Sequence, residues 1–383
     1  MGEWRECRLE EIGTLQRGRS RHRPRYAFHL YGGKYPFIQT GEIREARKYI
    51  IKYEQTYNEA GLEQSKLWPK NTLCITIAAN IAELAILSFD ACFPDSVLGF
   101  IPNKNVDLNF IYYTLVHFQK ELKHIGEGSV QDNINLGTFQ NISFPIPELP
   151  EQKAIAAVLS SLDDKIDLLH RQNKTLEAMA ETLFKQWFVV DAKEDWKEGT
   201  LADISLNIRD SVKVDAIDEN SNYIGLEHID RRNIALNRYG SGGEVNSNKY
   251  KFSEKDILFG KLRPYFHKVC FSPFSGICST DILVIRPIKN EFFCFCLFAF
   301  FQNDVVEFAN LGSGGTRMPR TDWGTLKTYP IAIPDMKTIN CFNDCVLPSI
   351  DKIKNNIQQI QTLETLRDNL LPKLMSGEVR VKS

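Results

Sequence analysis

Two long segments of the chain carry apolar residues at alternating steps of four and three positions, and this spacing is the clearest pattern in the sequence. The first segment begins after Pro150 and keeps the pattern for nearly five heptads, as far as Trp187. Such a seam is typical of an α-helix that packs along a partner helix. It predicts a helix of about 38 residues, roughly 57 Å long at 1.5 Å per residue. Its seam residues include Ile155, Leu159, Leu162, Ile166, Leu169, Asn173 and Leu176.

The second segment lies near the C-terminus and has mostly the same spacing between Ile339 and Leu374. Pro348 is predicted to mark a kink or the start of its regular helix, because proline cannot donate an interior backbone hydrogen bond. Gly377 is predicted to end this helix, since glycine readily adopts the left-handed conformation at a helix terminus. Its seam residues include Ile353, Ile357, Ile360 and Leu363.

Each long helix has a narrow apolar stripe beside a polar face, so each needs a partner helix. The simplest partner is the other long segment, which predicts an intramolecular coiled coil. The pairing must be antiparallel if two globular units are to sit apart, one at each end. Asn173 is the strongly polar member of the first seam, and a lone asparagine there usually fixes register or partner choice.

The rest of the chain forms two related halves, because residues 3–15 match residues 195–207 and a long Leu/Ile-rich segment follows each half. Each half has short strand-like runs, turn signals and one apolar helical segment, near residues 109–119 and 291–302. The predicted fold class is α+β, with two strand-rich domains separated by two long helices that form an antiparallel coiled coil. The aligned residues are Trp4, Leu9 and Ile12 with Trp196, Leu201 and Ile204. The predicted domains are residues 1–149, 150–190, 191–335 and 336–383.

Composition narrows the class of protein only slightly. The 383 residues include 47 Lys and Arg against 48 Asp and Glu, which excludes a uniformly cationic surface but leaves room for local basic patches. Nine cysteines without a Cys-x-x-Cys pair, and an N-terminus unlike a signal peptide, favour reduced thiols in a cytoplasmic protein. The longest uncharged apolar run, residues 292–301, is too short to span a bilayer.

Signatures of catalysis are missing from the sequence. It has no dinucleotide-binding or Walker glycine motif, no His-Glu-x-x-His, no Gly-x-Ser-x-Gly and no Asn/Asp-Pro-Pro-Tyr run of adenine methyltransferases. The adjacent pair Asp163 and Asp164 is interpreted as part of a solvated helix face. We therefore expect a protein without catalytic residues, without a metal site and without a cofactor of its own.

Three pairs of loops offer cationic and polar side chains to nucleic acid. Residues 16–26, the basic loop, alternate Arg with other residues and hold no acid, which suits phosphates, although a solvated loop is the alternative. Its counterpart in the second half is weaker, with Arg209 and Lys213. Residues 259–269 are predicted to form a strand, a turn and a strand, with Arg263 held extended before Pro264. The candidates in these loops are Arg17, Arg19 and Arg21 in the first half and Lys261, Arg263 and Tyr265 in the second.

The third pair of loops is rich in glycine and lies immediately before a predicted strand. Glycine permits a close approach of the backbone to a ligand, and the polar side chains can address base edges or phosphates. An ordinary turn is the alternative. The candidates are Ser129, Gln131 and Asn133 in residues 126–137, and Thr316, Arg317 and Arg320 in residues 312–323.

Residues 142–188 closely resemble the central conserved region of the specificity subunits of type I restriction–modification systems. Residues 366–381 resemble their C-terminal end, and Trp4 with the following Glu-Glu-Ile-Gly-Thr-Leu-Gln-Arg-Gly resembles the start of a target recognition domain. The resemblance implies a non-catalytic subunit in which each recognition domain reads one half of a bipartite DNA site from the major groove. It also implies that the helix pair sets the half-site separation and docks two methyltransferase subunits.

The same resemblance implies the remaining partners. S-adenosylmethionine would be bound by the methyltransferase subunits, and ATP with Mg²⁺ by motor-nuclease subunits that join for cleavage. Double-stranded DNA would be the ligand of this chain, and no membrane is implied. Two alternatives from other classes are an unrecognised nucleic-acid-modifying enzyme and a coiled-coil scaffold that binds protein.

Overall fold

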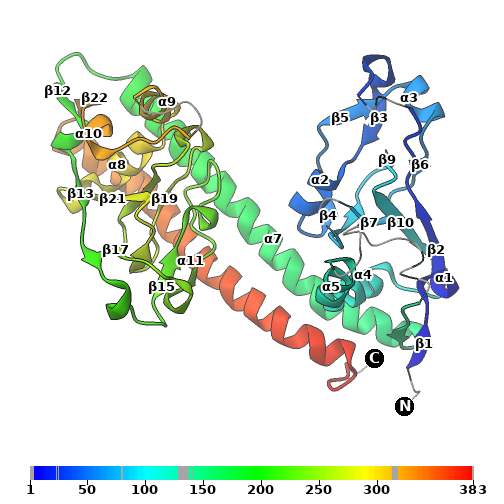
Figure 1. Cartoon of the computed structure of the whole chain (residues 1–383). Coiled ribbons are helices and arrows are strands. Elements are labelled where there is room, and N and C mark those ends of the chain that lie inside the picture. Colours follow the sequence, from blue (N-terminus) through cyan, green and yellow to red (C-terminus); the bar gives the residue numbers. More distant parts are fainter. Residues whose placement is uncertain are drawn as a thin grey trace. The chain divides into compact units, whose positions relative to one another are not determined.

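The computed structural model describes residues 4–22, 24, 26–78, 81–127, 137, 139, 141–312 and 318–381. The chain divides into two compact units (Figure 1). Unit 1 comprises Met1–Asp167 and Leu363–Ser383, and unit 2 comprises Leu168–Thr362. The boundaries fall inside both long helices, α7 (Leu149–Lys185) and α11 (Met336–Met375). Each unit therefore combines one strand-rich domain with a part of each helix.

Unit 1 is built on a five-stranded sheet of order β2-β10-β7-β8-β4, antiparallel except for the parallel pair β4 and β8. Strands β7 and β8 are buried throughout and apolar except for Thr76, as expected for strands covered on both faces. The same unit contains a four-stranded sheet of order β5-β3-β9-β6, whose strands alternate along the chain with those of the first sheet. Strand β1 pairs with β11. The strands are β1 (Arg5–Cys7), β2 (Gly13–Arg17), β3 (Tyr31–Phe37), β4 (Tyr49–Ile50), β5 (Gln55–Tyr57), β6 (Leu67–Trp68), β7 (Leu73–Thr76), β8 (Leu84–Leu87), β9 (Ala91–Cys92), β10 (Val97–Pro102) and β11 (Phe144–Ile146).

The helices of unit 1 cover its sheets and join them to the long helices. Apolar side chains of α4, including Phe110 and Leu115, share one buried cluster with Ile155 and Leu159 of α7 and with Leu374 of α11. Burial of this stripe explains why α4 forms in the apolar segment predicted near residues 109–119. The helices are α1 (Leu9–Ile12), η1 (Phe28–Leu30), α2 (Thr40–Glu45), α3 (Glu59–Glu63), α4 (Leu108–His117) and α5 (Gln119–Glu127).

Unit 2 repeats the plan with different detail. Its four-stranded antiparallel sheet has the order β13-β21-β18-β19, and a five-stranded sheet has the order β14-β17-β20-β15-β16 with β15 and β20 parallel. Strands β12 and β22 pair as β1 and β11 do in unit 1. The strands are β12 (Lys197–Thr200), β13 (Ser205–Ile208), β14 (Ser211–Val212), β15 (Asn222–Ile224), β16 (Gly240–Ser241), β17 (Lys249–Phe252), β18 (Ile257–Gly260), β19 (Val269–Phe271), β20 (Gly276–Cys278), β21 (Ile282–Pro287) and β22 (Pro330–Ile333).

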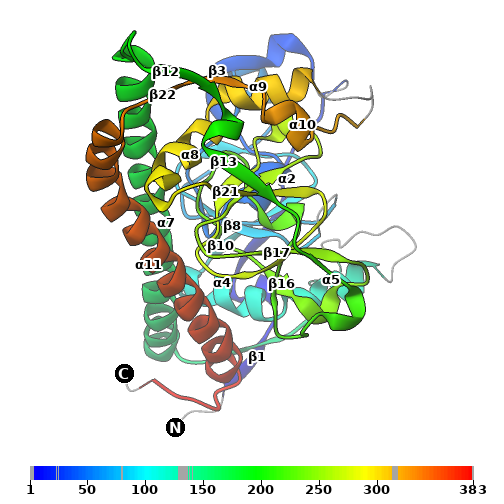
Figure 2. The same cartoon turned by 90° about the vertical axis from the view of Figure 1, so that its left-hand side faces the viewer.

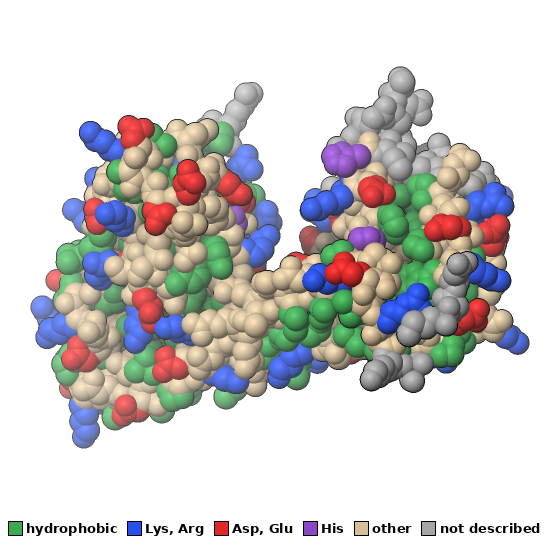
Figure 3. Space-filling model, turned by 90° about the horizontal axis from the view of Figure 1, so that it is seen from below, with side chains coloured by type: hydrophobic (Ala, Val, Ile, Leu, Met, Phe, Trp, Pro, Cys, Tyr) green, Lys and Arg blue, Asp and Glu red, His purple; other side chains and the backbone are tan. Residues whose placement is uncertain are grey.

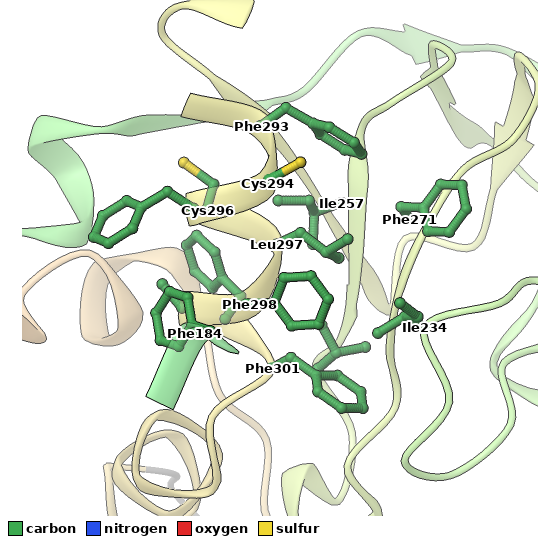
Figure 4. Packing of buried hydrophobic residues seen from close by; sticks show 14 of the residues in the cluster. Phe184, Ile234, Ile257, Phe271, Phe293, Cys294, Cys296, Leu297, Phe298 and Phe301 are labelled. Carbon is green, nitrogen blue, oxygen red and sulfur yellow. The ribbon is translucent and has the colours of Figure 1, made fainter. Parts of the chain in front are cut away.

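The core of unit 2 is centred on α8 (Phe293–Phe300), in which every residue is buried. Figure 4 shows Phe298 and Leu297 of this helix packed with Phe184 of α7 and with Ile257 of β18 in one cluster. The other helical segments are η2 (Gln186–Val190), η3 (Leu201–Asp203), η4 (Val214–Ala216), η5 (Leu226–His228), η6 (Gly242–Glu244), η7 (Pro264–Phe266), η8 (Asn290–Phe292), α9 (Asn303–Leu311) and α10 (Trp323–Leu326).

The two long helices lie side by side within each unit and run antiparallel (Figures 1 and 2). In unit 2, Asn173 contacts Asn356 and, further along α7, Phe184 contacts Phe342. The predicted fold class is therefore confirmed. Among the predicted seam residues, Ile155, Leu159, Ile166, Leu169, Asn173, Ile353, Ile357 and Ile360 are buried, while Leu162, Leu176 and Leu363 are half-buried.

Of the two roles predicted for Pro348, a kink or the start of the regular helix, the start is wrong, whereas the predicted end of the helix is confirmed. Helix α11 begins at Met336 and continues through Pro348, so this proline is not its start. Phe342 and Val346 before the proline, and Ile350 after it, are all buried. The free energy gained by burying these side chains outweighs the loss of the one backbone hydrogen bond that proline removes. The helix ends at Met375, and Gly377 has a φ of 74°.

Within the described part of the chain, no single helix is long and apolar enough to cross a membrane. One bent pair of helices, Asn290–Phe300 with Asn303–Leu311, has the length and composition of a membrane span, but only by those two criteria. Its first member contains α8, whose residues are all buried in the core of unit 2. The described residues also contain no group of three or more His, Cys, Asp or Glu side chains arranged to hold a metal ion.

Candidate nucleic-acid interface

The turn between β18 and β19, residues 261–268, holds three of the predicted candidates and is called the cationic turn below. The predicted strand, turn and strand are all present, but the predicted extended conformation of Arg263 is wrong. Arg263 is left-handed, with φ 51° and ψ 65°. Its backbone N–H donates to the carbonyl of Pro319 at 2.8 Å, and its own carbonyl accepts from Phe266 at 2.9 Å. These bonds and the burial of Pro264 outweigh the local preference before proline.

Backbone strain is concentrated at this turn. Among the described residues, six non-glycine residues have a positive φ, and three of them are Arg263, His267 and Arg232. Arg232 is held there by a bond from its N–H to the carbonyl of His267 at 2.9 Å. Each such conformation costs of the order of 1–3 kcal/mol, and residues of this kind cluster at binding and catalytic sites. The strain marks the cationic turn as a candidate site.

The segment that follows the second glycine-rich loop meets the cationic turn. Thr321 donates its backbone N–H to the carbonyl of Lys261 at 3.0 Å, and Leu262 forms a β-bridge with Arg320. The structure therefore brings together Lys261, Arg263 and Arg320, which the sequence places in two separate loops. The guanidinium of Arg320 forms an ion pair with Asp281. Thr316 and Arg317 of the same loop lie outside the described residues, as do Ser129, Gln131 and Asn133.

Like charges are held close together at this site. Burial lowers the pKa of Lys261, and the nearby guanidiniums of Arg320 and Arg209 lower it further. The pKa of Lys268 is lowered in the same way, first by burial and then by Arg231. A cation disfavours the charged form of a neighbouring lysine, so this arrangement is costly unless an anion neutralises it. Asp322 near Lys261, and Asp230 and Glu227 near Lys268, raise these pKa values in turn, so the site carries both signs of charge. The cations act more strongly than these acids on Lys261, which fits an anionic ligand there.

Two of the arginine side chains at this site form cation–π contacts with an aromatic ring. The guanidinium carbon of Arg231 lies 3.8 Å from the ring centre of Phe266, and that of Arg263 lies 5.8 Å from the same ring. Cation–π contacts of this kind fix the direction of a guanidinium. Tyr265, next to Phe266, is half exposed. Arg231 was not predicted from the sequence, because it lies in a different loop, 30 residues before Lys261.

Three buried polar atoms at the cationic turn and at the adjoining Thr321 have no hydrogen-bond partner in the described structure. They are Nε of Arg263, Nε2 of His267 and Oγ1 of Thr321. Burial lowers the pKa of His267 to about 4, so this ring is neutral at physiological pH. Unpaired buried polar atoms are rare in folded proteins and each calls for an explanation. A polar ligand at this surface would supply partners that the chain does not.

The basic loop of unit 1 divides into structural and exposed arginines. Arg19 donates from Nε to the carbonyl of Ser65 at 2.7 Å and is half-buried, so its guanidinium already holds the fold. Arg17 and Arg21 are exposed. Figure 3 shows that cationic and acidic side chains are interspersed on the face of the molecule that it displays. A basic surface therefore has to be located from local contacts, and here it rests on Arg17 and Arg21.

The interpretation of Asp163 as a solvated residue is wrong. Asp163 accepts hydrogen bonds from the hydroxyl of Tyr113 at 2.6 Å and from Arg367 at 2.9 Å. Lys48, which is buried, donates to Tyr113 at 3.2 Å and to Ser160 at 2.8 Å. These bonds join the strand-rich domain of unit 1 to α7 and α11. The sequence gave no signal for this network, because its members lie far apart along the chain.

A groove of about 690 Å³ in unit 1 runs along this network. Its lining carries more carboxylates than cations, so its charge opposes the binding of phosphates. The carboxylates are Glu42, Glu45, Glu83, Asp163, Asp164, Asp167, Glu364 and Asp368, and the cations are Arg47, Lys48, Lys52 and Arg367.

The comparisons with known proteins match two consecutive stretches of the chain to one family. The family model described as "Type I restriction modification DNA specificity domain" matches residues 1–178 and 193–365. The type I restriction enzyme MjaIX specificity subunit of Methanocaldococcus jannaschii is 27% identical over 416 residues, covering 99% of this chain and 94% of that protein. The HindI specificity subunit of Haemophilus influenzae is 21% identical over 473 residues, covering 99% of this chain and 100% of that protein.

The fold agrees with a solved structure as well. The crystal structure of a type I restriction–modification S subunit from M. genitalium superimposes with a TM-score of 0.60 at 17% identity, covering 97% of this chain and 96% of that one. At this identity the likeness concerns the fold, while the family model, which matches most of the chain in two consecutive copies, establishes the family. The chain belongs to the type I restriction–modification DNA specificity family, and it is a non-catalytic, DNA-binding specificity subunit of such a system.

Proposed function

We propose that each strand-rich domain reads one half of a bipartite, asymmetric site in double-stranded DNA from the major groove. In this proposal residues 1–149 and 191–335 are the two target recognition domains. The long helices, residues 150–190 and 336–383, set the distance between the half-sites and dock two methyltransferase subunits. The observation that carries the proposal is the cationic turn with the adjoining Arg320, where charge, strain and unpaired polar atoms coincide.

Phosphate contact is the chemistry that this turn fits best. Guanidinium and ammonium groups neutralise phosphates and release bound counterions, which supplies most of the sequence-independent affinity for DNA. Arg263, whose guanidinium lies near the ring of Phe266, is suited to a directed contact, whereas the compact charge of Lys261 suits a phosphate. Arg320 and Tyr265 would complete the surface in the domain of unit 2. In unit 1 we propose that Arg17 and Arg21 of the basic loop contact the DNA, with Arg19 acting through the fold of the loop.

The two domains differ where they would contact DNA, which supports an asymmetric site. The cationic turn of unit 2 corresponds in sequence to residues 75–86 of unit 1, which contain a single charged residue, Glu83. Glu83 pairs there with Lys123 at 2.9 Å. Because the side chains that address base edges set the sequence that is read, unlike loops on a shared plan predict unlike half-sites.

The helix pair is proposed as the element that fixes the half-site separation. Its buried apolar seam makes each helix depend on the other, so neither can shift alone without exposing apolar side chains. The exposed faces of α7 and α11 include Leu168, Met179 and Leu366, which supports docking of further subunits on the helices. We propose that S-adenosylmethionine is bound by the docked methyltransferases, and ATP and Mg²⁺ by motor-nuclease subunits. The assembled complex would act in the cytoplasm.

The test is to express the chain with its methyltransferase subunits in a host without this system and to map the methylated adenines by sequencing. We expect one motif of two short, unlike halves separated by a spacer of fixed length. Replacing residues 1–147 with another recognition domain of the family should change only one half. A continuous motif, or a replacement that changes both halves, would contradict the proposal.

A further inference from the structure

Phe28 is the most exposed large apolar side chain among the described residues, at 97% of its free surface. The next is Leu311 at 78%. Single exposed apolar side chains are common on protein surfaces, so exposure by itself carries no functional meaning. What distinguishes Phe28 is the way in which its backbone is held and the charge that surrounds it.

The backbone that carries Phe28 is fixed from below. It begins the short helical turn η1, whose third residue, Leu30, is buried in a small apolar cluster with Tyr57. The side-chain amide of Asn58 donates to the carbonyls of His29 at 2.9 Å and Tyr31 at 3.2 Å, and its backbone N–H donates to Leu30 at 3.0 Å. The turn is therefore anchored at each residue after Phe28, while the ring itself points into solvent.

One glycine shows how closely this turn is seated. A Cβ at Gly61 of α3 would come within 2.4 Å of the carbonyl oxygen of Leu30, so only glycine lets α3 approach the turn. Because the backbone is already held, only the side-chain torsions of Phe28 remain to be fixed when the ring binds. Pre-organisation of this kind lowers the cost of association.

The chain segment that carries Phe28 is basic, whereas α3, which packs against the turn, carries Glu59 and Glu63. Residues 16–30 contain no Asp or Glu. The basic loop is attached next to the turn, because His22 donates its backbone N–H to Gln64 at 3.0 Å and stacks edge-on against His29, with ring centres 4.9 Å apart. Arg21, one residue earlier, is exposed, and Tyr26 is 66% exposed. An exposed apolar ring on a held backbone thus projects next to a basic loop.

We propose that Phe28 is a wedge that inserts into the base stack of bound DNA, in the half-site read by the domain of unit 1. The inference rests on the proposed DNA-reading function and adds a role that base recognition does not require. Phosphates and the polar groove edges form few favourable contacts with a phenyl ring, whereas the stacked bases are the apolar part of DNA. Arginines of the basic loop hold the backbone while the ring parts one base step.

Such a wedge has a specific use in this kind of complex. A methyltransferase must take its target base out of the stack, and this costs a few kcal/mol for a paired base. A neighbouring step that is already opened and bent lowers this cost. In the cationic turn of unit 2 the exposed aromatic residue, Tyr265, is only half exposed and packs against Phe266 with ring centres 4.7 Å apart, so it is less suited to insertion than Phe28. We therefore expect an opened step in the half-site that unit 1 reads.

The experiment uses the full chain in complex with its methyltransferase subunits and duplexes of the mapped site. 2-Aminopurine, whose fluorescence rises on unstacking, replaces bases one at a time in each half, the methylated adenine excepted. We expect a rise at one step in the half that the exchange of residues 1–147 assigns to unit 1. Phe28→Ala should abolish this rise and weaken binding about 5- to 150-fold, as for the loss of one stacked base. Phe28→Leu, which can still insert, should retain part of both.

Three controls separate the wedge from other effects. Ile51→Ala removes another exposed apolar side chain, at 64%, from the same unit and should change neither fluorescence nor affinity. The salt dependence of binding should be unchanged in Phe28→Ala, because no charge is lost, but shallower in Arg21→Ala. The unfolding midpoint of Phe28→Ala should equal that of the wild type, since the ring is almost fully exposed.

The outcomes distinguish this inference from the proposed function. If the wild-type complex binds its site but no position fluoresces, or if Phe28→Ala binds and fluoresces as the wild type does, the wedge is wrong and DNA reading stands. If the wild-type complex shows no preference for any mapped site, the proposed function itself fails.

Discussion

Asn356 of α11 donates a hydrogen bond of 2.7 Å from its side-chain amide to the amide oxygen of Asn173 of α7. The same amide donates to Gln172 at 2.9 Å, and both asparagines are buried. The polar member that the sequence shows in the first seam therefore has a polar partner in the second. Nδ2 of Asn173 and Oδ1 of Asn356 are left unpaired, so the pair costs stability. Any other register would separate the two amides, which makes the pair suited to fixing the alignment of the helices.

Asn356→Leu should destabilise unit 2 by about 1–3 kcal/mol, because it leaves the amide of Asn173 buried without its partner. The double variant Asn173→Leu with Asn356→Leu should recover most of this loss, since both polar groups are then removed together. Urea unfolding followed by circular dichroism measures both. A single variant as stable as the wild type would show that the amide pair has no energetic role.

Arg367→Met should destabilise unit 1 by about 1–3 kcal/mol, because Asp163 would lose a charged partner at a largely buried position. The matched control is Arg8→Met, which breaks an exposed pair with Glu11 and should cause little or no change. Thermal unfolding of the two variants gives the comparison. Equal effects would mean that the Asp163 network contributes no more than a surface ion pair.

Stability should fall as the pH falls from about 6.5 to about 4, in part because of His267. Burial and the nearby Arg232 hold the pKa of His267 at about 4, while Glu181 and Lys174 act on it in opposite directions. As the pH falls, the His267 ring takes up a proton near pH 6.5 in the unfolded chain but only near pH 4 in the folded chain. This favours the unfolded chain, so the stability seen above pH 6.5 is progressively lost between pH 6.5 and pH 4. His267→Gln should flatten the profile by up to about 3 kcal/mol. An unchanged profile in unfolding experiments from pH 7 to pH 4 would exclude this role.

Asp281→Asn should strengthen binding to DNA of any sequence, because it releases Arg320 from its ion pair. Arg320→Ala should weaken binding and make its salt dependence shallower by about one phosphate contact. Glu254→Gln, which removes an equal charge by releasing Lys354 of α11, is the control for net charge and should have a smaller effect. Filter binding at several salt concentrations measures all three, and equal effects of the two acid variants would argue against a local role of Arg320.

Matched insertion of one heptad near Asn173 and near Ile360 should lengthen the spacer between half-sites by up to about three base pairs. Each insertion adds roughly 10.5 Å of helix, and DNA rises about 3.4 Å per base pair. A whole heptad keeps each apolar seam facing its partner, and the insertions must be paired so that no seam residue is left uncovered. Sequencing of methylated sites gives the spacer. A stable, active variant that keeps the original spacing would refute the helices as its determinant.

The long helices and the twofold plan of the chain could be predicted from sequence because their signals are local and repeated. Helix α7 begins at Leu149, next to the predicted start, and α11 ends just before the predicted stop at Gly377. Spacing of apolar residues over many turns specifies both the helix and the side that it buries. That α11 continues through Pro348 was less predictable, because proline has a local cost that only the buried side chains around it could outweigh.

The candidate interface could be predicted only in part. The sequence supplied Lys261, Arg263 and Arg320 as separate candidates, since basic residues in loops are visible without a structure. That they meet depends on the bond between Lys261 and Thr321, whose residues are 60 positions apart. Arg231 joins them from yet another loop through Phe266.

By itself, the sequence determined which segments are helices, that two like domains alternate with them, and to which family the chain belongs. Each of these follows from residue spacing or from a motif within one stretch of chain. Tertiary structure alone decided that Arg263 is left-handed, that the half-buried Asp163 is bonded to Tyr113 and Arg367, and that Phe28 is left in solvent. The physical reason is that backbone strain, charge pairing and exposure are set by partners distant in sequence, whose contacts can outweigh the local preference of a residue.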